Sequence, residues 1–152
     1  MTRTTQSIYD ATGRLRAVQD ATGGTTYFFY DAAGRLSATV DATGAVTRTL
    51  YDAIGRVSGT TTYATRVATA GWYSAGAVTK DTLVYAATSP GLGSGQAWVQ
   101  TDAANDRTAT RTYDAAGRLA SEIDAAGLVT AYAYDGAGRL LSATQSRPGD
   151  AT

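Results

Sequence analysis

The sequence predicts an all-β fold, an antiparallel meander of β-hairpins that forms a curved sheet. Three observations predict it: a seven-residue motif recurs, turn signals follow at a fixed spacing, and the residues between turns are β-forming and of strand length. "YDAAGRL" occurs at Tyr30–Leu36 and Tyr113–Leu119, and near-copies begin at Tyr9, Tyr51 and Tyr134. A catalytic motif is needed once per active site, whereas a motif used five times is typical of a structural repeat.

The repeat has a period of 21 residues. The motif glycines are spaced 21, 21, 62 and 21, so the long gap is close to three periods. Two degraded copies fit inside it, one around Gly76, where Trp72 replaces the repeat tyrosine, and one around Gly95 in "SPGLGSGQAWV". Seven units of 21 account for 147 of the 152 positions. We therefore predict that residues 1–152 form a single array, degenerate over about 58–100.

Each intact motif contains Asp-x-x-Gly, which predicts a turn. The aspartate accepts a hydrogen bond from the backbone N–H two residues on, and the glycine takes positive φ at no steric cost. This pattern is typical of a type I turn with a glycine bulge, a common hairpin connection. Fainter signals such as "DATG" at Asp20 and Asp41 place a second glycine 10 residues after a motif glycine, and Asn105 stands at that position in the sixth unit. Asparagine also tolerates the left-handed conformation. Each unit is thus predicted to be two antiparallel strands.

The hairpin assigns a structural role to the motif residues. Asp10 is expected opposite Arg14, and Tyr9 opposite Leu15, with the repeat tyrosines on the core face. Val40 and Val46 suggest the opposite parity, which a bulge or a different second turn would reconcile. The repeat residues are Tyr9, Asp10, Gly13, Arg14, Tyr30, Asp31, Gly34, Arg35, Tyr51, Asp52, Gly55, Arg56, Tyr113, Asp114, Gly117, Arg118, Tyr134, Asp135, Gly138 and Arg139. Fourteen strands in one sheet would exceed the width at which open sheets curl, so we expect curvature.

The pattern "YDxxGRL…DxxG…Y" resembles the YD-repeat, or RHS-repeat, family over essentially the whole chain. The resemblance implies a β-sheet ribbon that spirals into a hollow shell. Such shells occur in bacterial polymorphic toxins and insecticidal toxin complexes, where they enclose a toxic carboxy-terminal segment, and related repeats occur in cell-surface proteins. Carbohydrate binding has been proposed for some members. The chain has no Asp-Pro of the "DPxG" self-cleavage kind that follows complete shells, and its ending is "SRPGDAT", so we interpret it as a fragment or short relict of a shell.

Composition argues against several function classes. The formal net charge is zero, from 13 basic and 13 acidic residues, so no excess charge favours nucleic acid. Histidine and cysteine are absent, which removes the commonest general base and the thiolate metal sites. "MTRTTQSIYD" has no apolar core for a signal peptide, and no stretch reaches the roughly 18 to 20 apolar residues of a membrane span.

Site-like patterns have structural explanations. Tyr-Asp pairs could stack on glycans, but the hairpin already explains every copy. The "DATG" turns lack the alternating carboxylates of calcium loops, and "GLGSG" lacks the Lys-Ser/Thr of a phosphate loop. Asp102 and Asp106 form a carboxylate cluster, yet Asp102 is itself a turn residue. Trp72 and Trp98 interrupt the pattern, so they are the better candidates for ligand contact, although packing is favoured for Trp72.

The sequence therefore predicts a non-enzymatic structural segment with no catalytic residue, metal or cofactor. It would be secreted or exposed at the cell surface as part of a larger protein. Its partners would be further repeat units, or copies of itself through unpaired edge strands. An encapsulated toxin segment or a glycan is a further expected partner, and the alternative function is a carbohydrate- or protein-binding module that uses the concave face.

Overall fold

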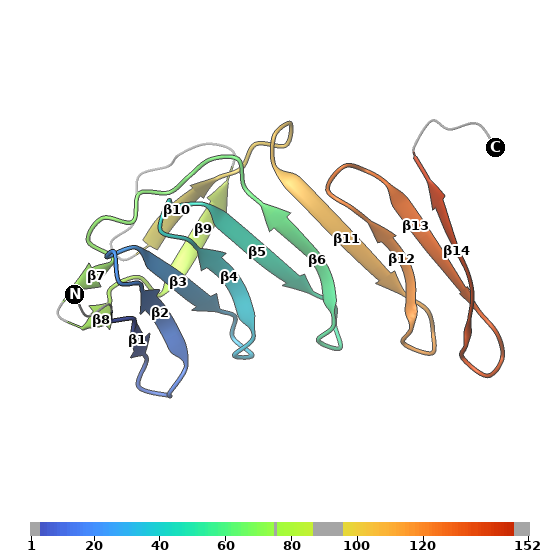
Figure 1. Ribbon diagram of the computed structural model, residues 1–152, viewed down its shortest axis with the longest axis horizontal. Helices are drawn as coiled ribbons and strands as arrows, with labels where there is room; N and C mark the ends of the chain where they lie inside the picture. The colour runs from blue at the N-terminus through green and yellow to red at the C-terminus, as the bar shows by residue number, and fades with distance from the viewer. Residues whose placement is uncertain (1–3, 75, 87–95, 148–152) are drawn as a thin grey trace. The chain divides into compact units, whose positions relative to one another are not determined.

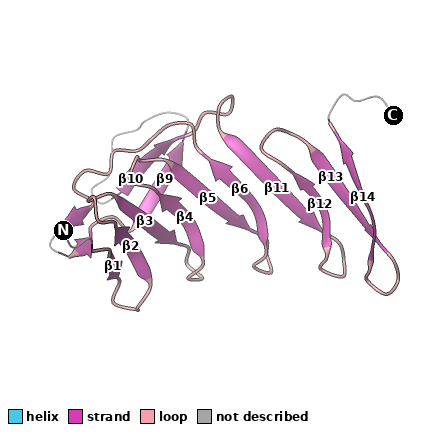
Figure 2. Cartoon of the chain, in the orientation of Figure 1, coloured by secondary structure: helices cyan, strands magenta, loops and turns pink. Residues whose placement is uncertain are grey.

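The structure is a computed structural model that describes residues 4–74, 76–86 and 96–147. Its described residues contain strands, turns and loops but no helix (Figure 2). The strands are β1 (Gln6–Tyr9), β2 (Leu15–Gln19), β3 (Thr25–Tyr30), β4 (Leu36–Val40), β5 (Val46–Tyr51), β6 (Val57–Thr62), β7 (Tyr73–Ser74), β8 (Ala77–Val78), β9 (Thr82–Ala86), β10 (Gln96–Gln100), β11 (Arg107–Tyr113), β12 (Leu119–Ile123), β13 (Val129–Tyr134) and β14 (Leu140–Ser146).

Ten strands form the main sheet, hydrogen bonded in the order β1-β2-β3-β4-β5-β6-β11-β12-β13-β14 (Figure 1). This order confirms the predicted antiparallel meander. The chain divides into two compact units, Met1–Arg48 with Thr62–Asp106, and Thr49–Thr61 with Arg107–Thr152. Each unit is described below by itself, and the predicted curvature of the whole sheet stays a prediction.

The predicted turns are formed as expected from their sequence. At the first motif, the Gly13 amide donates to the Asp10 carbonyl at 3.0 Å, and the Asp10 amide donates to the Arg14 carbonyl at 2.9 Å. Gly13 has φ +83°, which explains the requirement for glycine there. The same two hydrogen bonds recur at all five motifs, and at the fainter turns that begin at Asp20, Asp41 and Asp124.

A β-bulge in four of the intact motif hairpins, those that begin at Tyr9, Tyr30, Tyr113 and Tyr134, explains the conflict in strand parity. Phe29 pairs with Ala38, and the next residue, Tyr30, pairs with Leu36, so Ser37 is the extra residue. Tyr27 and Phe29 therefore share the buried face of the sheet, whereas Tyr30 lies on the other face. The prediction that repeat tyrosines lie on the core face was wrong, because the bulge moves the motif to the opposite face. The pairing of Tyr9 with Leu15 is confirmed.

The buried apolar residues of the described chain all lie in the first unit. They are Ile8, Ala17, Tyr27, Phe29, Ala38, Val40, Val46, Tyr63, Val67, Trp72, Ala97 and Val99. Some come from β1–β5 and the others from residues 63–74, 76–86 and 96–101, which we call the cover segment. Trp72 packs edge-on against Tyr27 and Phe29, with ring centroids 5.3 and 6.0 Å apart. The core therefore consists of side chains packed between one face of β1–β5 and this segment.

The cover segment is bound to the sheet by backbone hydrogen bonds as well as packing. The Tyr63 amide donates to the Val46 carbonyl at 2.9 Å, and the Val67 amide donates to the Gly44 carbonyl at 2.8 Å. A Cβ added to Gly44 would lie 2.2 Å from the Val67 carbonyl oxygen. Glycine is therefore required at position 44 for two reasons. It adopts φ +82° in its turn, and its lack of a side chain leaves room for the cover segment.

The cover segment departs from the predicted repeat. The prediction of fourteen strands in one sheet was wrong, because among the described strands β7 and β8 form a separate two-stranded sheet, and β9 and β10 form a separate parallel ladder. In "WYSAG" no aspartate precedes the glycine to form the turn, although Gly76 keeps φ +83°. The degraded copy around Gly95, with its "GLGSG" stretch, lies outside the described residues.

Candidate functional site

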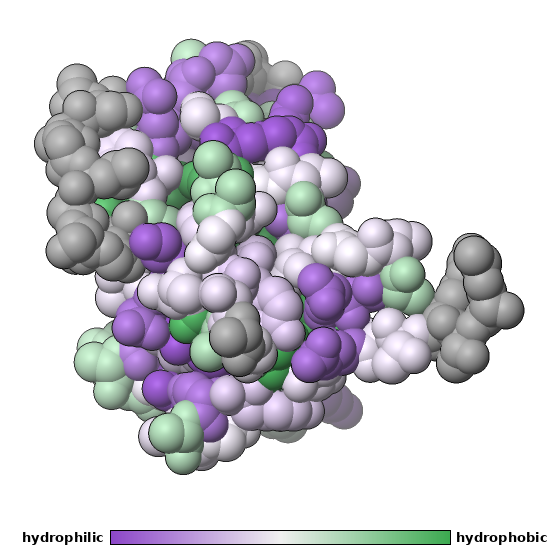
Figure 3. Space-filling view, turned by 90° about the vertical axis from the view of Figure 1, so that its left-hand side faces the viewer, coloured by the Kyte–Doolittle hydropathy of each residue, from purple (hydrophilic) through white to green (hydrophobic). Residues whose placement is uncertain are grey.

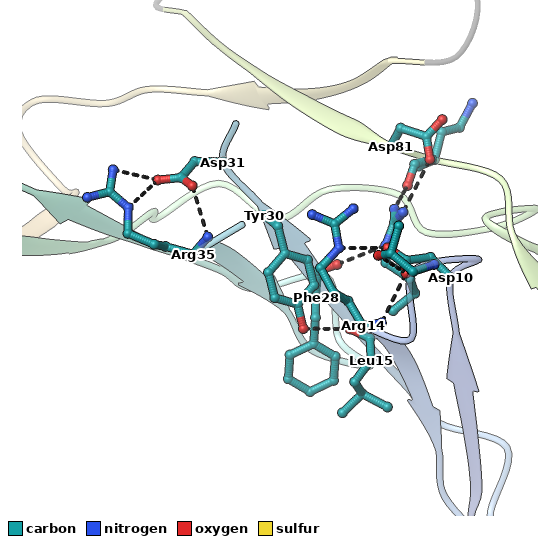
Figure 4. Close-up of polar contacts among 11 residues, drawn as sticks. Asp10, Arg14, Leu15, Phe28, Tyr30, Asp31, Arg35 and Asp81 are labelled. Carbon is teal, nitrogen blue, oxygen red and sulfur yellow. Dashed lines mark hydrogen bonds and ion pairs between the residues drawn. The ribbon is translucent and has the colours of Figure 1, made fainter. Parts of the chain in front are cut away.

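The aspartate of each motif is the acceptor around which its turn is built. In the first motif, Asp10 Oδ1 accepts hydrogen bonds from the backbone amides of Thr12 and Arg14 at 2.9 and 3.0 Å. Its Oδ2 accepts one from Arg14 Nε at 2.8 Å (Figure 4). The Asp31–Arg35 pair has the same geometry, with Nε to Oδ2 at 2.7 Å. The carboxylate thus fixes the turn and the direction of the arginine side chain together.

These hydrogen bonds keep the aspartates ionised. The pKa of Asp10 is lowered from its ordinary value, chiefly by the Thr12 hydroxyl and next by the Arg14 backbone amide. The pKa of Asp31 is lowered chiefly by the Arg35 side chain, and that of Asp135 chiefly by the Arg139 backbone amide. The charged form is therefore the form the turn binds.

Three motif tyrosines, Tyr30, Tyr113 and Tyr134, each contact the neighbouring hairpin that precedes them in the sheet. The Tyr30 hydroxyl donates to the Leu15 carbonyl at 2.8 Å, and the Arg14 guanidinium carbon lies 5.1 Å from the centre of the Tyr30 ring (Figure 4). We call this arrangement the tyrosine lock: a tyrosine on the arginine of the preceding hairpin, with its hydroxyl on the next residue's carbonyl. Arginine over an aromatic face is an attractive cation–π contact. Because the aspartate orients that arginine, the Asp–Arg pair of one motif positions the surface on which the tyrosine of the next motif packs.

The tyrosine lock recurs in the second unit. Tyr134 donates to the Leu119 carbonyl at 2.9 Å, and the Arg118 guanidinium lies 4.6 Å from its ring centre. Tyr113 donates to the Val57 carbonyl at 2.8 Å, and Arg56 lies 4.1 Å from its ring.

Sequence reasoning placed each tyrosine opposite a residue of its own hairpin and missed the contact with the preceding hairpin. Tyr30 follows Leu15 by 15 residues, as Tyr134 follows Leu119. That constant spacing was the available signal. It could not be interpreted without the bulge, which determines the face on which each tyrosine lies.

Arg16, the bulge residue of the first hairpin, is another functional residue that the sequence analysis missed. Its guanidinium donates to the Lys80 carbonyl at 2.5 Å and to Asp81 Oδ1 at 3.3 Å, and its Nε donates to the Phe28 carbonyl at 3.3 Å. The side chain is only 12% exposed. Arg16 thus ties the cover segment to the sheet.

The two tryptophans occupy different environments. Trp72 is 4% exposed and belongs to the core, as favoured from the sequence. Trp98 is half-buried and lines a pocket of about 420 Å³ together with Arg66 and Lys80. Within the described residues, its buried indole N–H has no hydrogen-bond partner. The pocket lies wholly in the first unit, and Trp72 contributes to its wall.

The acidic cluster has a structural role. Asp106 Oδ2 accepts from the Asp102 amide at 2.8 Å, and its Oδ1 accepts from the Ala64 amide at 2.8 Å. Asp102 Oδ1 accepts from the Ala104 amide at 3.1 Å, as in the other turns. Over the described ranges, no group of three or more histidine, cysteine, aspartate or glutamate residues is arranged to hold a metal ion. The same ranges contain no helix long and apolar enough to cross a membrane.

Comparison with known proteins identifies the repeat. A family model described as RHS Repeat matches residues 9–46, 30–68, 98–128 and 113–149. No curated protein matches the chain. Similar solved structures include a crystal structure of TcdB2-TccC3-Cdc42, with 24% identity over 95% of this chain and 9% of that chain, and a TM-score of 0.35.

Two further solved structures are similar at the same level. A crystal structure of TcdB2-TccC3-TEV has 23% identity over 98% of this chain and 10% of that chain, with a TM-score of 0.28. A Tc holotoxin pore of Photorhabdus luminescens has 21% identity over 98% and 10%, also with a TM-score of 0.28. This chain spans about a tenth of the length of these proteins. TM-scores of this size do not define a shared global arrangement.

Proposed function

This chain belongs to the RHS-repeat family, and from that premise we propose that it is a section of the wall of a β-shell. Its role as a structural repeat segment follows from the family and from the meander of hairpins. More specifically, we propose that the wall lines a cavity in a toxin-associated or surface-exposed protein, and that this cavity encloses a polypeptide. The whole protein would be secreted or displayed at the cell surface, and the segment itself would have no catalytic role.

The observation that carries the proposal is the tyrosine lock. Each lock joins two successive hairpins of the sheet through a hydrogen bond and a cation–π contact, both independent of any ligand. A buried or half-buried contact of each kind contributes about 0.5 to 1.5 kcal/mol. Repeated along an array, such nearest-neighbour contacts add to the stability of the sheet, as in other repeat proteins. The motif is thus used to build a continuous wall.

The proposal is tested by measuring whether neighbouring hairpins stabilise one another through the lock. Tyr113→Phe removes the hydrogen bond to the Val57 carbonyl and leaves the ring in place. We expect amide hydrogen exchange to accelerate in both flanking strands, β6 and β11, by about three- to tenfold. Tyr132→Phe is the matched control, because Tyr132 lies in β13 outside the motif. Exchange that changes only at the substituted residue would contradict a mechanically coupled wall.

A second candidate function rests on the pocket beside Trp98. The pocket presents an indole, the cations of Arg66 and Lys80, and the amide of Gln100, a combination that can bind a glycan or a segment of a partner protein. A glycan array probed with the full chain tests the glycan form of this hypothesis. Signal that is present for the parent chain and for a Tyr132→Phe control, but lost in Trp98→Ala, would support it. Absence of signal for the parent chain would leave the wall as the only function proposed.

A further inference from the structure

The cover segment contains a strand edge that has no partner within the described residues. Strand β10 pairs with β9 in a two-stranded parallel ladder (Figure 1). The Thr101 amide, just after β10, donates to the Ala86 carbonyl at 2.9 Å. Backbone groups of successive strand residues point to opposite edges, so those of Val99 also point to β9. Those of Trp98 and Gln100 therefore point to the other edge, where the described residues place no strand.

The pocket beside Trp98 lies along this edge of β10. Ala97 and Trp98 both line it, although successive side chains of a strand point to opposite faces. None of its lining residues belongs to β9. A pocket that is lined from both faces of β10, but not by β9, lies beside the edge that β9 leaves open. Another wall is formed by residues 65–68, which are bound to the sheet through the Val67 amide and the Gly44 carbonyl.

The charge of the pocket is positive. Arg66 and Lys80 line it, and its described lining contains no acidic residue. The motif arginines each form an ion pair with the aspartate of their own turn. Arg66 and Lys80 form no ion pair with a described residue. The pocket therefore attracts a negatively charged ligand.

Neighbouring groups compensate the two cations to different degrees. Arg66 donates to the Thr43 hydroxyl and carbonyl. The pKa of Asp41 is lowered chiefly by the Thr43 hydroxyl, and the Arg66 charge contributes to this lowering, so Asp41 compensates part of the Arg66 charge. Asp81 follows Lys80 in sequence but is already paired with an arginine of β2. We therefore expect the half-buried Lys80 to be the main cation available to a ligand.

The surrounding surface favours backbone pairing and charge over broad apolar contact. Seen from the side on which β1, β7 and β8 lie in Figure 1, the described surface is mostly polar or neutral, and its hydrophobic patches are small (Figure 3). An open strand edge with a pocket beside it suits the addition of a strand. In that mode of recognition, main-chain hydrogen bonds supply affinity, and pockets for alternate side chains supply specificity.

We propose that the open edge of β10 binds an acidic, extended segment of a partner polypeptide as an added strand. The backbone of that segment pairs with the backbone groups of Trp98 and Gln100. One of its carboxylate side chains enters the pocket and contacts Lys80, while the Trp98 indole packs against its apolar stem. This inference rests on the second candidate function, the pocket beside Trp98, and names the chemistry of the partner that it accepts.

Fluorescence anisotropy of labelled peptides titrated with the full chain tests the proposal. The probe is a short peptide in which glutamate alternates with valine, and we expect saturable binding with a dissociation constant of about 10 to 100 μM. The same peptide with lysine in place of glutamate should bind at least about tenfold more weakly. A version with methylated backbone nitrogens at its central residues keeps its charge but loses its main-chain donors, so it should also bind at least about tenfold more weakly.

A charge variant tests the role of the pocket. Lys80→Gln removes the cation and should raise the dissociation constant of the acidic peptide about three- to tenfold. Arg107→Gln is the matched control, because Arg107 is an exposed cation of β11 that does not line the pocket. The control should bind the peptide like the parent chain. Unchanged circular dichroism and melting of both variants would show that folding is retained.

Amide hydrogen exchange with and without the acidic peptide locates the added strand. The peptide should slow exchange at the amides of Trp98 and Gln100, which face the open edge, and change little at Val99, which faces β9. Each of four results would overturn the proposal: no binding of the acidic peptide, equal binding of either control peptide, unchanged affinity in Lys80→Gln, or no protection at Trp98 and Gln100.

Failure of this inference is distinguishable from failure of the proposed functions. A glycan signal that is lost in Trp98→Ala, without binding of the acidic peptide, would retain the second candidate function and overturn this inference. The Tyr113→Phe exchange experiment tests the wall in β6 and β11, which do not line the pocket.

Discussion

The hairpins of β1–β4 and those of β11–β14 share one motif and one register, yet only the first are covered. Tyr27 and Phe29 stand opposite Val40 and Ala38 in the covered region, and the cover segment buries them. In the uncovered region the corresponding residues are Thr110 and Thr112, opposite Ile123 and Ser121. The next hairpin has Ala131 and Ala133 there, both exposed.

This difference separates two sources of stability. The turn hydrogen bonds and tyrosine locks occur in both regions, so they are properties of the repeat. The apolar core occurs only where the cover segment packs, and it is encoded at positions outside the YD motif. The repeat therefore specifies the sheet, whereas the residues between motifs specify whether a face is buried.

The largest expected effect on stability comes from removing the side chain at the centre of the core. Trp72→Ala deletes the ring that packs on Tyr27 and Phe29 and should lower the free energy of unfolding by about 3 to 5 kcal/mol. Urea unfolding followed by circular dichroism measures the loss. Trp98→Ala is the control and should cost clearly less, because Trp98 is only half-buried. If both variants lost the same free energy of unfolding, Trp72 would not be at the centre of the core.

A reciprocal exchange between the regions sharpens the comparison. Phe29→Thr puts the uncovered residue type into the core and should cost about 2 to 4 kcal/mol, from lost burial and a cavity. Thr112→Phe makes the opposite change on a face without cover and should alter the free energy of unfolding by less than about 1 kcal/mol. Both values come from the same urea titration. A large cost at Thr112 would show that its face is packed.

Acid should unfold the two regions at different pH values. Both regions depend on aspartates whose pKa values are lowered on folding, but only β1–β4 also pack on an apolar core. A lowered pKa means that the stabilisation is present above the unfolded value, near 3.8, and is lost as pH falls through the folded value. The uncovered hairpins have no core to compensate, so we expect them to lose structure at a higher pH than β1–β4. Residue-resolved NMR between about pH 5 and pH 2 measures this order.

The acid prediction has an internal control in the turns themselves. Asp135→Asn retains a turn acceptor but removes the titration, so the acid sensitivity of its hairpin should decrease. If β1–β4 unfolded first on acidification, the assignment of additional stability to the covered region would be wrong.

The smallest expected effect concerns one lock in the uncovered region. Tyr134→Phe removes the hydrogen bond to the Leu119 carbonyl and should cost about 1 kcal/mol. Tyr132→Phe, in the same strand, should cost less than about 0.5 kcal/mol. Thermal unfolding of the two variants gives the difference, and equal melting temperatures would show that the Tyr134 hydroxyl makes no net contribution.

The sequence was sufficient to predict the hairpins because their determinants are local. An aspartate and a glycine three residues apart specify each turn, and five copies make the register unambiguous. The pairing of Tyr9 with Leu15 followed from that turn alone. The family resemblance added the role of a structural repeat segment, which the RHS-repeat matches support.

The remaining features depend on contacts between distant residues. The face of Tyr30 depends on a bulge that no residue type marks, and its partner is a backbone carbonyl. The parallel pairing of β9 with β10 and the packing of Trp72 depend on how residues 63–101 return to the sheet. One signal was available, because aromatic residues at Tyr27 and Phe29 contrast with threonines at the same positions of a later repeat.

Residue-resolved amide hydrogen exchange of the unmodified chain tests the central claim most directly, since it reports the opening free energy of each strand. We predict that β3 and β4, which pack on the core and have a paired strand on each side, exchange slowest. Strands β11–β14 should exchange faster, with β14 the fastest of the paired strands. Uniform exchange across the ten strands, or slower exchange in β11–β14 than in β3 and β4, would contradict it.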